Sequence, residues 1–240
     1  MSIYWDIEVF AELPSTQSIC KNGAEDGKAE GYVVRALKQT QGKGRHGKSW
    51  VSDEGGLAFS FVLRPGVPVK NIGQISIAVG VALAEVFVRY LPESDVKLKW
   101  PNDVFLEGKK AAGILLETNL NEKQNVEWLV VGIGINFNSA PDIGHALCNF
   151  SDIDVEPTVF LNDVLSCIGD RYATLKSAGF ETIRKAWLGY SYPVGTLLNV
   201  GRFHSLDEMG NLIVRDEAGS LKSVSAGDVH LKEQHYAVGH

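Results

Sequence analysis

The 240-residue sequence has few of the features that mark secreted, membrane or metal-binding proteins. Its three cysteines, Cys20, Cys148 and Cys167, have neither the close spacing of metal ligands nor the even number of a disulfide framework. Acidic residues and Pro14 stand where a secretory signal is basic and then apolar. The longest apolar stretch, 75–84, is about half as long as a bilayer-spanning helix. We therefore expect a cytoplasmic protein with reduced thiols and no membrane association.

Excess positive charge is also absent. The 23 basic and 29 acidic residues leave a net charge of −6, so nucleic-acid binding would need a local basic patch. Only 14 residues precede Ser15, too few for a helix-turn-helix domain, and we expect no DNA partner. The 45% of hydrophobic residues and 22% of charged residues are ordinary for a globular protein. The length suits one sizeable domain, or one domain with a small appendage.

Hydrophobic periodicity divides the chain into an α+β part and an all-β tail. Ser15 is the expected N-cap of a helix that ends near Gly23. The further helices are expected at 71–91, 158–177 and 180–190, and strands at 31–37, 57–63, 96–100, 104–106, 111–118 and 128–136. After Pro193 only short strand-like pieces follow: "TLLNV", "NLIVRD", "LKSVSA" and "VHLK". We expect one domain over 1–190 and a small β-barrel over 191–240, too small to carry much core alone.

The stretch "GKGRHGKS", Gly42 to Ser49, matches the spacing of a phosphate-binding P-loop. A true P-loop follows a buried strand directly and opens a helix whose amides point at phosphate. Here the strand ends near Leu37, polar residues intervene, and no helical periodicity follows Ser49. We interpret the stretch instead as a flexible cationic loop, named the basic loop below, whose glycines let the backbone approach an anion.

Six motifs that occur in one order resemble those of biotin protein ligases, also called biotin–[acetyl-CoA-carboxylase] ligases. They are "STQ" (15–17), "QTQGKGRHGKSW" (39–50), "GGLAFS" (55–60), "KWPND" (99–103), "KKAAGILLE" (109–117) and "GIGINFN" (132–138). The resemblance covers roughly residues 1–190. It implies an α+β fold, with a mixed sheet and helices related to class II aminoacyl-tRNA synthetases. The tail suits that family's small SH3-like C-terminal domain.

The resemblance also implies a reaction and its partners. Biotin and ATP would give biotinyl-5′-AMP and pyrophosphate, and the biotinyl group would pass to a lysine of a biotin carboxyl carrier protein domain. Mg²⁺ would enter with the phosphates of ATP, and we expect no dedicated metal site of protein ligands. The resemblance leaves open whether the protein is a homodimer.

The site residues that the resemblance implies fall into three overlapping sets. Those for catalysis are Arg45, Lys110 and Asp103. Those for biotin are Ser15, Thr16, Gln17, Gln39, Lys43, Gly44, Arg45, Lys110 and Gly113. Those for ATP are Lys43, Arg45, Trp50, Lys110 and Asn136. Basic residues suit this chemistry because a carboxylate must attack the α-phosphate, and both groups are anions.

Several of these residues also have a purely structural interpretation. Asp103 either orients or deprotonates the incoming lysine, or it forms an Asx turn after Asn102. Ser15 is also a plausible helix cap, and Asn136 could simply end a strand. Trp50 covers either ligand or packs in the core.

Two positions depart from the usual family pattern. Lys43 stands where arginine is usual, which keeps the charge but loses a bidentate contact. Gln17 replaces a frequent asparagine. Lipoate ligases and octanoyltransferases share the fold, but the chain has "KWPND" and lacks their histidine-bearing pattern. A biotin-binding module without catalysis remains a third reading.

Overall fold

The computed structural model describes residues 3–50, 55–138 and 155–232, and they form two sheets with helices. The larger sheet has the strand order β1-β2-β3-β7-β6-β5-β4. Its strands are β1 (Asp6–Leu13), β2 (Tyr32–Gln39), β3 (Leu57–Leu63), β4 (Val96–Lys99), β5 (Asp103–Leu106), β6 (Lys109–Leu120) and β7 (Val126–Ile135). Only β1 and β2 pair in parallel, and the remaining neighbours are antiparallel, so the sheet is mixed as expected.

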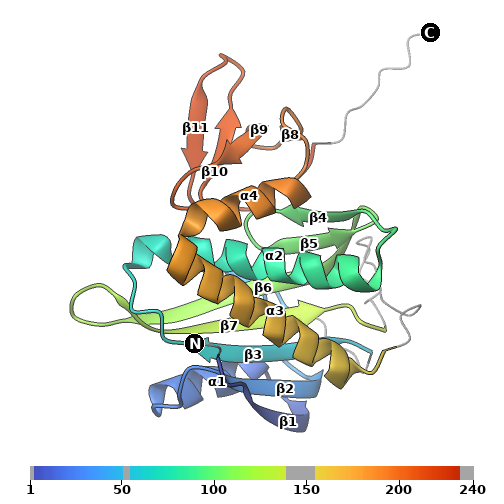
Figure 1. Cartoon of the computed structure of the whole chain (residues 1–240), viewed down its shortest axis with the longest axis vertical. Coiled ribbons are helices and arrows are strands. Elements are labelled where there is room, and N and C mark those ends of the chain that lie inside the picture. Colours follow the sequence, from blue (N-terminus) through green and yellow to red (C-terminus); the bar gives the residue numbers. More distant parts are fainter. Residues whose placement is uncertain (1–2, 51–54, 139–154, 233–240) are drawn as a thin grey trace.

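Helices α2 (Ile72–Tyr90) and α3 (Pro157–Ala178) pack over one face of this sheet (Figure 1). Helix α2 lies between the sheet and α3, so it is apolar on nearly all sides rather than on one stripe. Among the described residues, 69–90 is the one helical stretch long and apolar enough to cross a membrane, and 67% of its most apolar window is buried inside the protein. Its composition is thus accounted for by the core.

Helix α1 (Thr16–Glu25) covers the opposite face, but only at one end of the sheet. It connects the parallel strands β1 and β2, as a crossover between parallel strands must. Cys20 and Ala24 on α1 pack against Val34, Val62 and other residues that point to this side. Within 3–50, 55–138 and 155–232, no helix covers the rest of this face, toward β5 and β6, and the site lies here.

The smaller sheet has the order β11-β10-β9-β8 and follows α4 (Phe180–Tyr190). Its strands are β8 (Leu197–Leu198), β9 (Gly201–Leu206), β10 (Leu212–Arg215) and β11 (Leu221–Val224). Its apolar residues join the main core, and the rings of Trp187 and Phe203 lie 6.3 Å apart. The Trp100 indole N–H donates to the carbonyl of Gly210 at 2.9 Å. The tail therefore shares a core with the larger part, as its small size requires.

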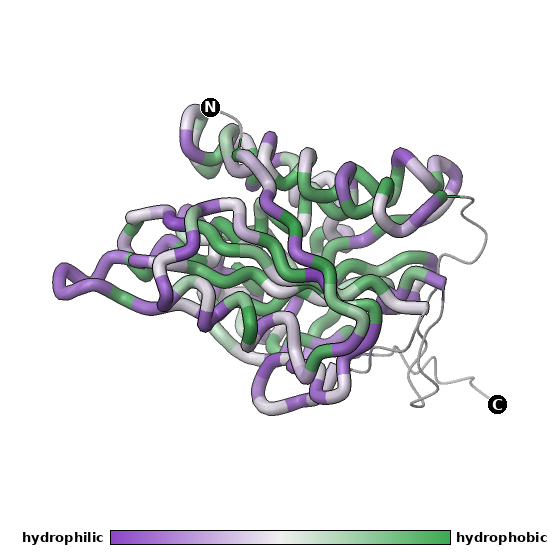
Figure 2. The backbone as a smooth tube through the Cα atoms, turned by 90° about the horizontal axis from the view of Figure 1, so that it is seen from below, coloured by the Kyte–Doolittle hydropathy of each residue, from purple (hydrophilic) through white to green (hydrophobic). Residues whose placement is uncertain are grey.

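Figure 2 shows hydrophobic residues concentrated in the packed strands and helices, with hydrophilic residues in the loops between them. The expected helices and strands are confirmed, with ends that differ by a few residues, except that "VHLK" (229–232) forms only an isolated bridge at Leu231 and no strand. Two strands escaped sequence analysis. Strand β1 contains no buried residue, and β9 begins at Gly201 among turn signals. Cys20 and Cys167 are buried free thiols, whereas Cys148 lies outside the described residues.

The aromatic cluster between α2 and α3 gives a stability prediction. Phe160 has no exposed surface, and its ring lies 5.1 Å from both Tyr90 and Phe137. We expect Phe160→Ala to lower the free energy of unfolding by about 3–5 kcal/mol through lost burial and a residual cavity. Urea denaturation followed by circular dichroism would measure it. Val159, 51% exposed on the same helix, is the control: Val159→Ala should change stability by about 0.5 kcal/mol or less. Equal losses would contradict the predicted packing role.

Candidate active site

A cavity of about 700 Å³ opens beside α1, on the face of the sheet that α1 covers in part. Its walls come from the start of α1, the basic loop, β3, the β4–β7 strands and the C-terminal segment 228–230. Every residue implied by the family motifs lines this one cavity: Ser15, Thr16, Gln17, Gln39, Lys43, Gly44, Arg45, Trp50, Asp103, Lys110, Gly113 and Asn136. Residues far apart in sequence thus meet at one place.

Glycines form the floor of the cavity. Gly113 on β6 and Gly134 on β7 are register partners, and Gly132, two residues before Gly134, lies on the same face. The Trp50 indole lies across this floor, so a Cβ at Gly134 would come 2.5 Å from its ring nitrogen. A Cβ at Gly132 would collide with Gln17 Oε1. The absence of side chains here makes the space that the cavity occupies.

One end of the cavity is neutral and closely hydrogen-bonded. The Thr16 backbone N–H donates to Gln39 Oε1 at 2.8 Å, and Thr16 Oγ1 lies 2.9 Å from Ser60 Oγ. Ser60 Oγ donates to Gln17 Oε1 at 3.0 Å, and Gln17 Nε2 donates to the carbonyl of Val130. These buried polar groups satisfy one another, so the end of the cavity keeps its shape without a ligand.

Ser15 is the exception in this network. It occupies the N-cap position of α1, but its hydroxyl makes no capping hydrogen bond. The side chain is 1% exposed, and Ser15 Oγ has no hydrogen-bond partner. The expected helix-cap interpretation is therefore right about position and wrong about the side chain. A buried hydroxyl without a partner is costly, which supports a role in holding a polar ligand.

The other end of the cavity is cationic. The basic loop is closed by backbone hydrogen bonds, from Gly44 to Lys48 at 2.7 Å and from Trp50 to Gly42 at 2.9 Å. Arg45 Nη1 donates to Asn102 Oδ1 at 3.0 Å. Asn102 is in turn anchored, because its side-chain amide donates to the carbonyl of Ile114 on β6. The guanidinium of Arg45 is thus held against the sheet from outside the loop.

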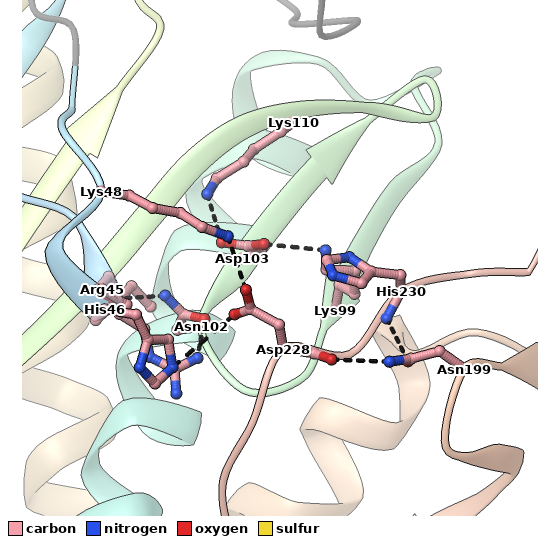
Figure 3. Close-up of polar contacts among 11 residues, drawn as sticks. Arg45, His46, Lys48, Lys99, Asn102, Asp103, Lys110, Asn199, Asp228 and His230 are labelled. Atoms are coloured by element: carbon pink, nitrogen blue, oxygen red, sulfur yellow. Dashed lines mark hydrogen bonds and ion pairs between the residues drawn. The ribbon is translucent and has the colours of Figure 1, made fainter.

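Asp103 joins two lysines from neighbouring strands (Figure 3). Its carboxylate lies 2.7 Å from Lys110 Nζ on β6 and 3.2 Å from Lys99 Nζ on β4. The β5–β6 turn allows this, since Glu107 and Gly108 both have positive φ, as in a two-residue hairpin. The ion pairs replace the Asx turn that the sequence left as an alternative for Asp103. Lys110 Nζ also lies 5.4 Å from the centroid of the Trp50 ring.

Asn136 directly follows β7, beside the start of β6. Its backbone N–H donates to the carbonyl of Ala111, and Nδ2 donates to that of Lys110 at 3.0 Å. The structural interpretation of Asn136 is thus met, and the side chain also faces the cavity. The same bonds fix the backbone from which Lys110 projects.

The cavity has a charge opposite to that of the chain. Five basic side chains line it, against two acidic ones among the described residues. The acidic residues are Asp103 and Asp228, and the basic ones are Lys43, Arg45, Lys48, Lys99 and Lys110. A net positive cavity in a chain of net charge −6 attracts anions to one place.

The model of the biotin/lipoate A/B protein ligase family matches residues 9–136, which include most of the cavity. The chain belongs to this family. The P-loop alternative is thereby excluded, and β3 rather than a helix follows the basic loop in the described residues. Membership accounts for the order of the six motifs.

Individual members of the family extend the comparison. A bifunctional ligase/repressor of Bacillus subtilis is 30% identical over 246 residues, which cover 95% of this chain and 73% of that protein. A biotin–[acetyl-CoA-carboxylase] ligase of Paracoccus denitrificans is 34% identical, covering 78% of this chain and 85% of the relative. The biotin protein ligase of Aquifex aeolicus, solved with biotin and ATP, superposes with a TM-score of 0.80 at 28% identity, covering 95% and 99%.

Sequence reasoning missed several residues of the cavity wall. Lys99 and Asn102 belong to the "KWPND" motif, and membership of this motif is the signal that could have identified them. Ser60 ends the "GGLAFS" motif, where the sequence predicts only a strand. Asp228 and His230 lie in the β-rich tail, and nothing in the local pattern marks them.

The Asp103 ion pairs lead to a second stability prediction. Asp103→Asn would leave Lys99 and Lys110, with side chains 14% and 30% exposed, close together without a counter-ion. We expect a loss of about 1–3 kcal/mol in the free energy of unfolding, measured by urea denaturation. The matched control is Asp95, whose side chain is 58% exposed and lies 3.0 Å from Lys97. Asp95→Asn should cost about 0–1 kcal/mol. A smaller loss for Asp103→Asn than for Asp95→Asn would refute the role assigned to these pairs.

Proposed function

We propose that this protein activates biotin with ATP to biotinyl-5′-AMP and transfers the biotinyl group to a lysine of a biotin carboxyl carrier protein domain. One observation carries the proposal: a single cavity joins a neutral, hydrogen-bonded end to a cluster of five cations. Such a cavity suits a ligand with an uncharged polar ring at one end and a carboxylate at the other. The relatives named as biotin ligases support the choice of biotin.

Biotin would bind at the neutral end. Its ureido ring needs both donors and acceptors, and Ser15 Oγ is a buried group that still lacks a partner. The hydroxyl and amide groups of Thr16, Ser60 and Gln39 already support one another, so they hold their directions before the ligand arrives. The glycine floor would contact the apolar part of the ligand.

Adenylation would take place at the cationic end. A biotin carboxylate oxygen attacks the α-phosphorus of ATP, and the bond to the β-phosphate oxygen breaks as pyrophosphate leaves. Both reactants are anions, so Arg45, Lys43 and Lys110 would offset their repulsion and the charge that grows on the phosphate. Trp50 lies beside Lys110 and would exclude water from the reacting groups. Asn136 would contribute to the nucleotide side.

Transfer would follow from the same cavity. The neutral amine of a carrier lysine attacks the carbonyl of the mixed anhydride, and AMP leaves with the bonding electron pair. The amine must lose protons overall, and Asp103 is the nearby carboxylate. Its ion pairs with Lys99 and Lys110 support a positioning role for Asp103 in the empty enzyme. The Mg²⁺ that accompanies ATP would be held chiefly by phosphate oxygens and water.

The proposed division of the chain places the catalytic part at 1–190 and the small C-terminal domain at 191–240. The separate four-stranded sheet supports this boundary. The shared core around Trp187 and Phe203 argues that the two parts act as one unit. We propose a cytoplasmic enzyme whose macromolecular partner is the carrier domain rather than DNA.

The decisive experiment offers purified protein Mg²⁺, ATP and either biotin, lipoate or octanoate. We expect pyrophosphate release with biotin alone, and biotin incorporation into a carrier domain but not into the same domain with its acceptor lysine changed to arginine. Release with lipoate or octanoate instead would make the protein a ligase for those acids. Biotin binding without pyrophosphate release would make it a non-catalytic binding module.

The unpartnered Ser15 hydroxyl gives a prediction that separates ligand binding from stability. Ser15→Ala should not lower the free energy of unfolding, because no capping bond is lost, and removal of an unpaired buried hydroxyl should if anything raise it. It should weaken biotin binding about tenfold, the value of one hydrogen bond of roughly 1.4 kcal/mol. Isothermal titration calorimetry and thermal melting would measure the two effects.

Ser60 is the matched comparison, since it is equally buried but fully bonded. Ser60→Ala should cost about 1–3 kcal/mol of stability, because Gln17 and Thr16 lose a buried partner. If Ser15→Ala destabilised the protein and left biotin affinity unchanged, the hydroxyl would be structural.

A further inference from the structure

The C-terminal sheet contributes part of the cavity wall. Asp228, Val229 and His230 line the cavity together with the basic loop. They lie near the end of the described residues, far from the basic loop in sequence. Val229 is 3% exposed and belongs to the core, so the segment is packed in place rather than loosely laid over the opening.

Asp228 makes a direct contact with the basic loop (Figure 3). Its Oδ2 atom lies 2.7 Å from Lys48 Nζ, across 180 positions of sequence. Its Oδ1 atom lies 4.0 Å from His46 Nε2. One carboxylate thus faces two loop residues that sequence analysis left without roles.

Asp228 is held from behind by the sheet. Asn199 brackets the segment, because its Nδ2 donates to the carbonyl of Asp228 at 3.0 Å and its Oδ1 accepts from the backbone of His230 at 2.8 Å. The backbone N–H of Asn199 donates to the carbonyl of His230, and Leu198 bridges to Leu231. The carboxylate is therefore fixed to the sheet. Lys48 reaches it from the basic loop, and the side chain of Lys48 is 66% exposed.

The position of Asp228 conflicts with the work of the cavity. A cavity that must take the phosphates of ATP carries a fixed carboxylate on its wall. The ion pair with Lys48, with smaller effects from His46 and His230, holds the pKa of Asp228 below its ordinary value. Asp228 is therefore an anion at neutral pH. It pairs with Lys48, a cation that would otherwise be available to bind phosphate.

We propose that Asp228 is a positioning residue that stands in for phosphate: it holds the basic loop over the empty cavity through Lys48, and it gives up Lys48 to the phosphates of ATP. The inference rests on the proposed use of ATP. Exchange is feasible because the pair is largely exposed and worth little, whereas phosphate offers more charge. Breaking the Asp228–Lys48 pair lowers the affinity for the nucleotide. Before the nucleotide binds, the same pair holds the basic loop near the position in which it would contact phosphate.

The test measures anion binding directly. Isothermal titration calorimetry with tripolyphosphate, and separately with ATP, compares the full chain with its Asp228→Asn variant. We expect the Kd of the variant to be about three- to tenfold lower at low ionic strength, because one nearby negative charge is removed. The difference should shrink at high salt, where exposed charges are screened. In steady-state assays the KM for ATP should fall.

Asp216 provides the control for charge and for loss of an ion pair. It lies in the same C-terminal part, pairs with Lys222 at 2.9 Å and does not line the cavity. Asp216→Asn should leave the Kd for tripolyphosphate unchanged. Thermal melting of both variants checks that they remain folded. An unchanged or higher Kd in Asp228→Asn overturns the inference.

Hydrogen exchange tests the other half of the proposal. Amides of the basic loop should exchange faster in empty Asp228→Asn than in the parent chain or in Asp216→Asn, and tripolyphosphate should restore protection in all three. Equal exchange in the three empty proteins overturns the holding role of Asp228. Because tripolyphosphate binding needs no biotin, the two hypotheses fail separately. An active ligase with unchanged anion affinity in Asp228→Asn refutes only the inference. Absent pyrophosphate release, with a lower Kd for tripolyphosphate and for ATP in Asp228→Asn, refutes only the proposed function.

Discussion

Mutual repulsion among cations that share one cavity is the constraint on which the rest of this site depends. Five basic side chains must stay together before any anionic ligand arrives. The protein offsets their repulsion in two ways. Asp103 bridges Lys99 and Lys110 from a neighbouring strand, and Asp228 pairs with Lys48. Positive charge is thereby concentrated in one place before a substrate binds.

The sheet supplies the geometry that this concentration of charge needs. Helices α2 and α3 cover one face, and the main apolar core lies between them and the sheet. The other face is covered by α1 only in part, and glycines on β6 and β7 keep the remainder open. Rigid strands thus carry Lys110 and Asp103, while a loop carries Arg45 and Lys48. Groups that must hold their positions and groups that must move come from different kinds of structure.

Sequence reasoning predicted the features that depend on local sequence patterns. The spacing of apolar residues predicted α2, and the family motifs brought Ser15, Gln39 and Lys110 to one cavity before their contacts were known. Strand β1 left no such record, because an edge strand with no buried residue lacks alternation. The contact of Asp228 with Lys48 depends on tertiary packing alone. Likewise, the motif named Asp103 but could not show that its carboxylate pairs with two lysines.

The residues of the cavity wall are also synthesised at different times. A chain leaves the ribosome N-terminus first, so Ser15, the basic loop and Lys110 emerge long before Asp228 and Val229. During synthesis, the basic side chains are therefore present for a period without the segment that closes one wall around them. Because Val229 joins the core of the larger part, the final enclosure of the site is coupled to the folding of the C-terminal sheet. A ribosome-bound intermediate would expose its cations to the surrounding polyanions until that sheet forms.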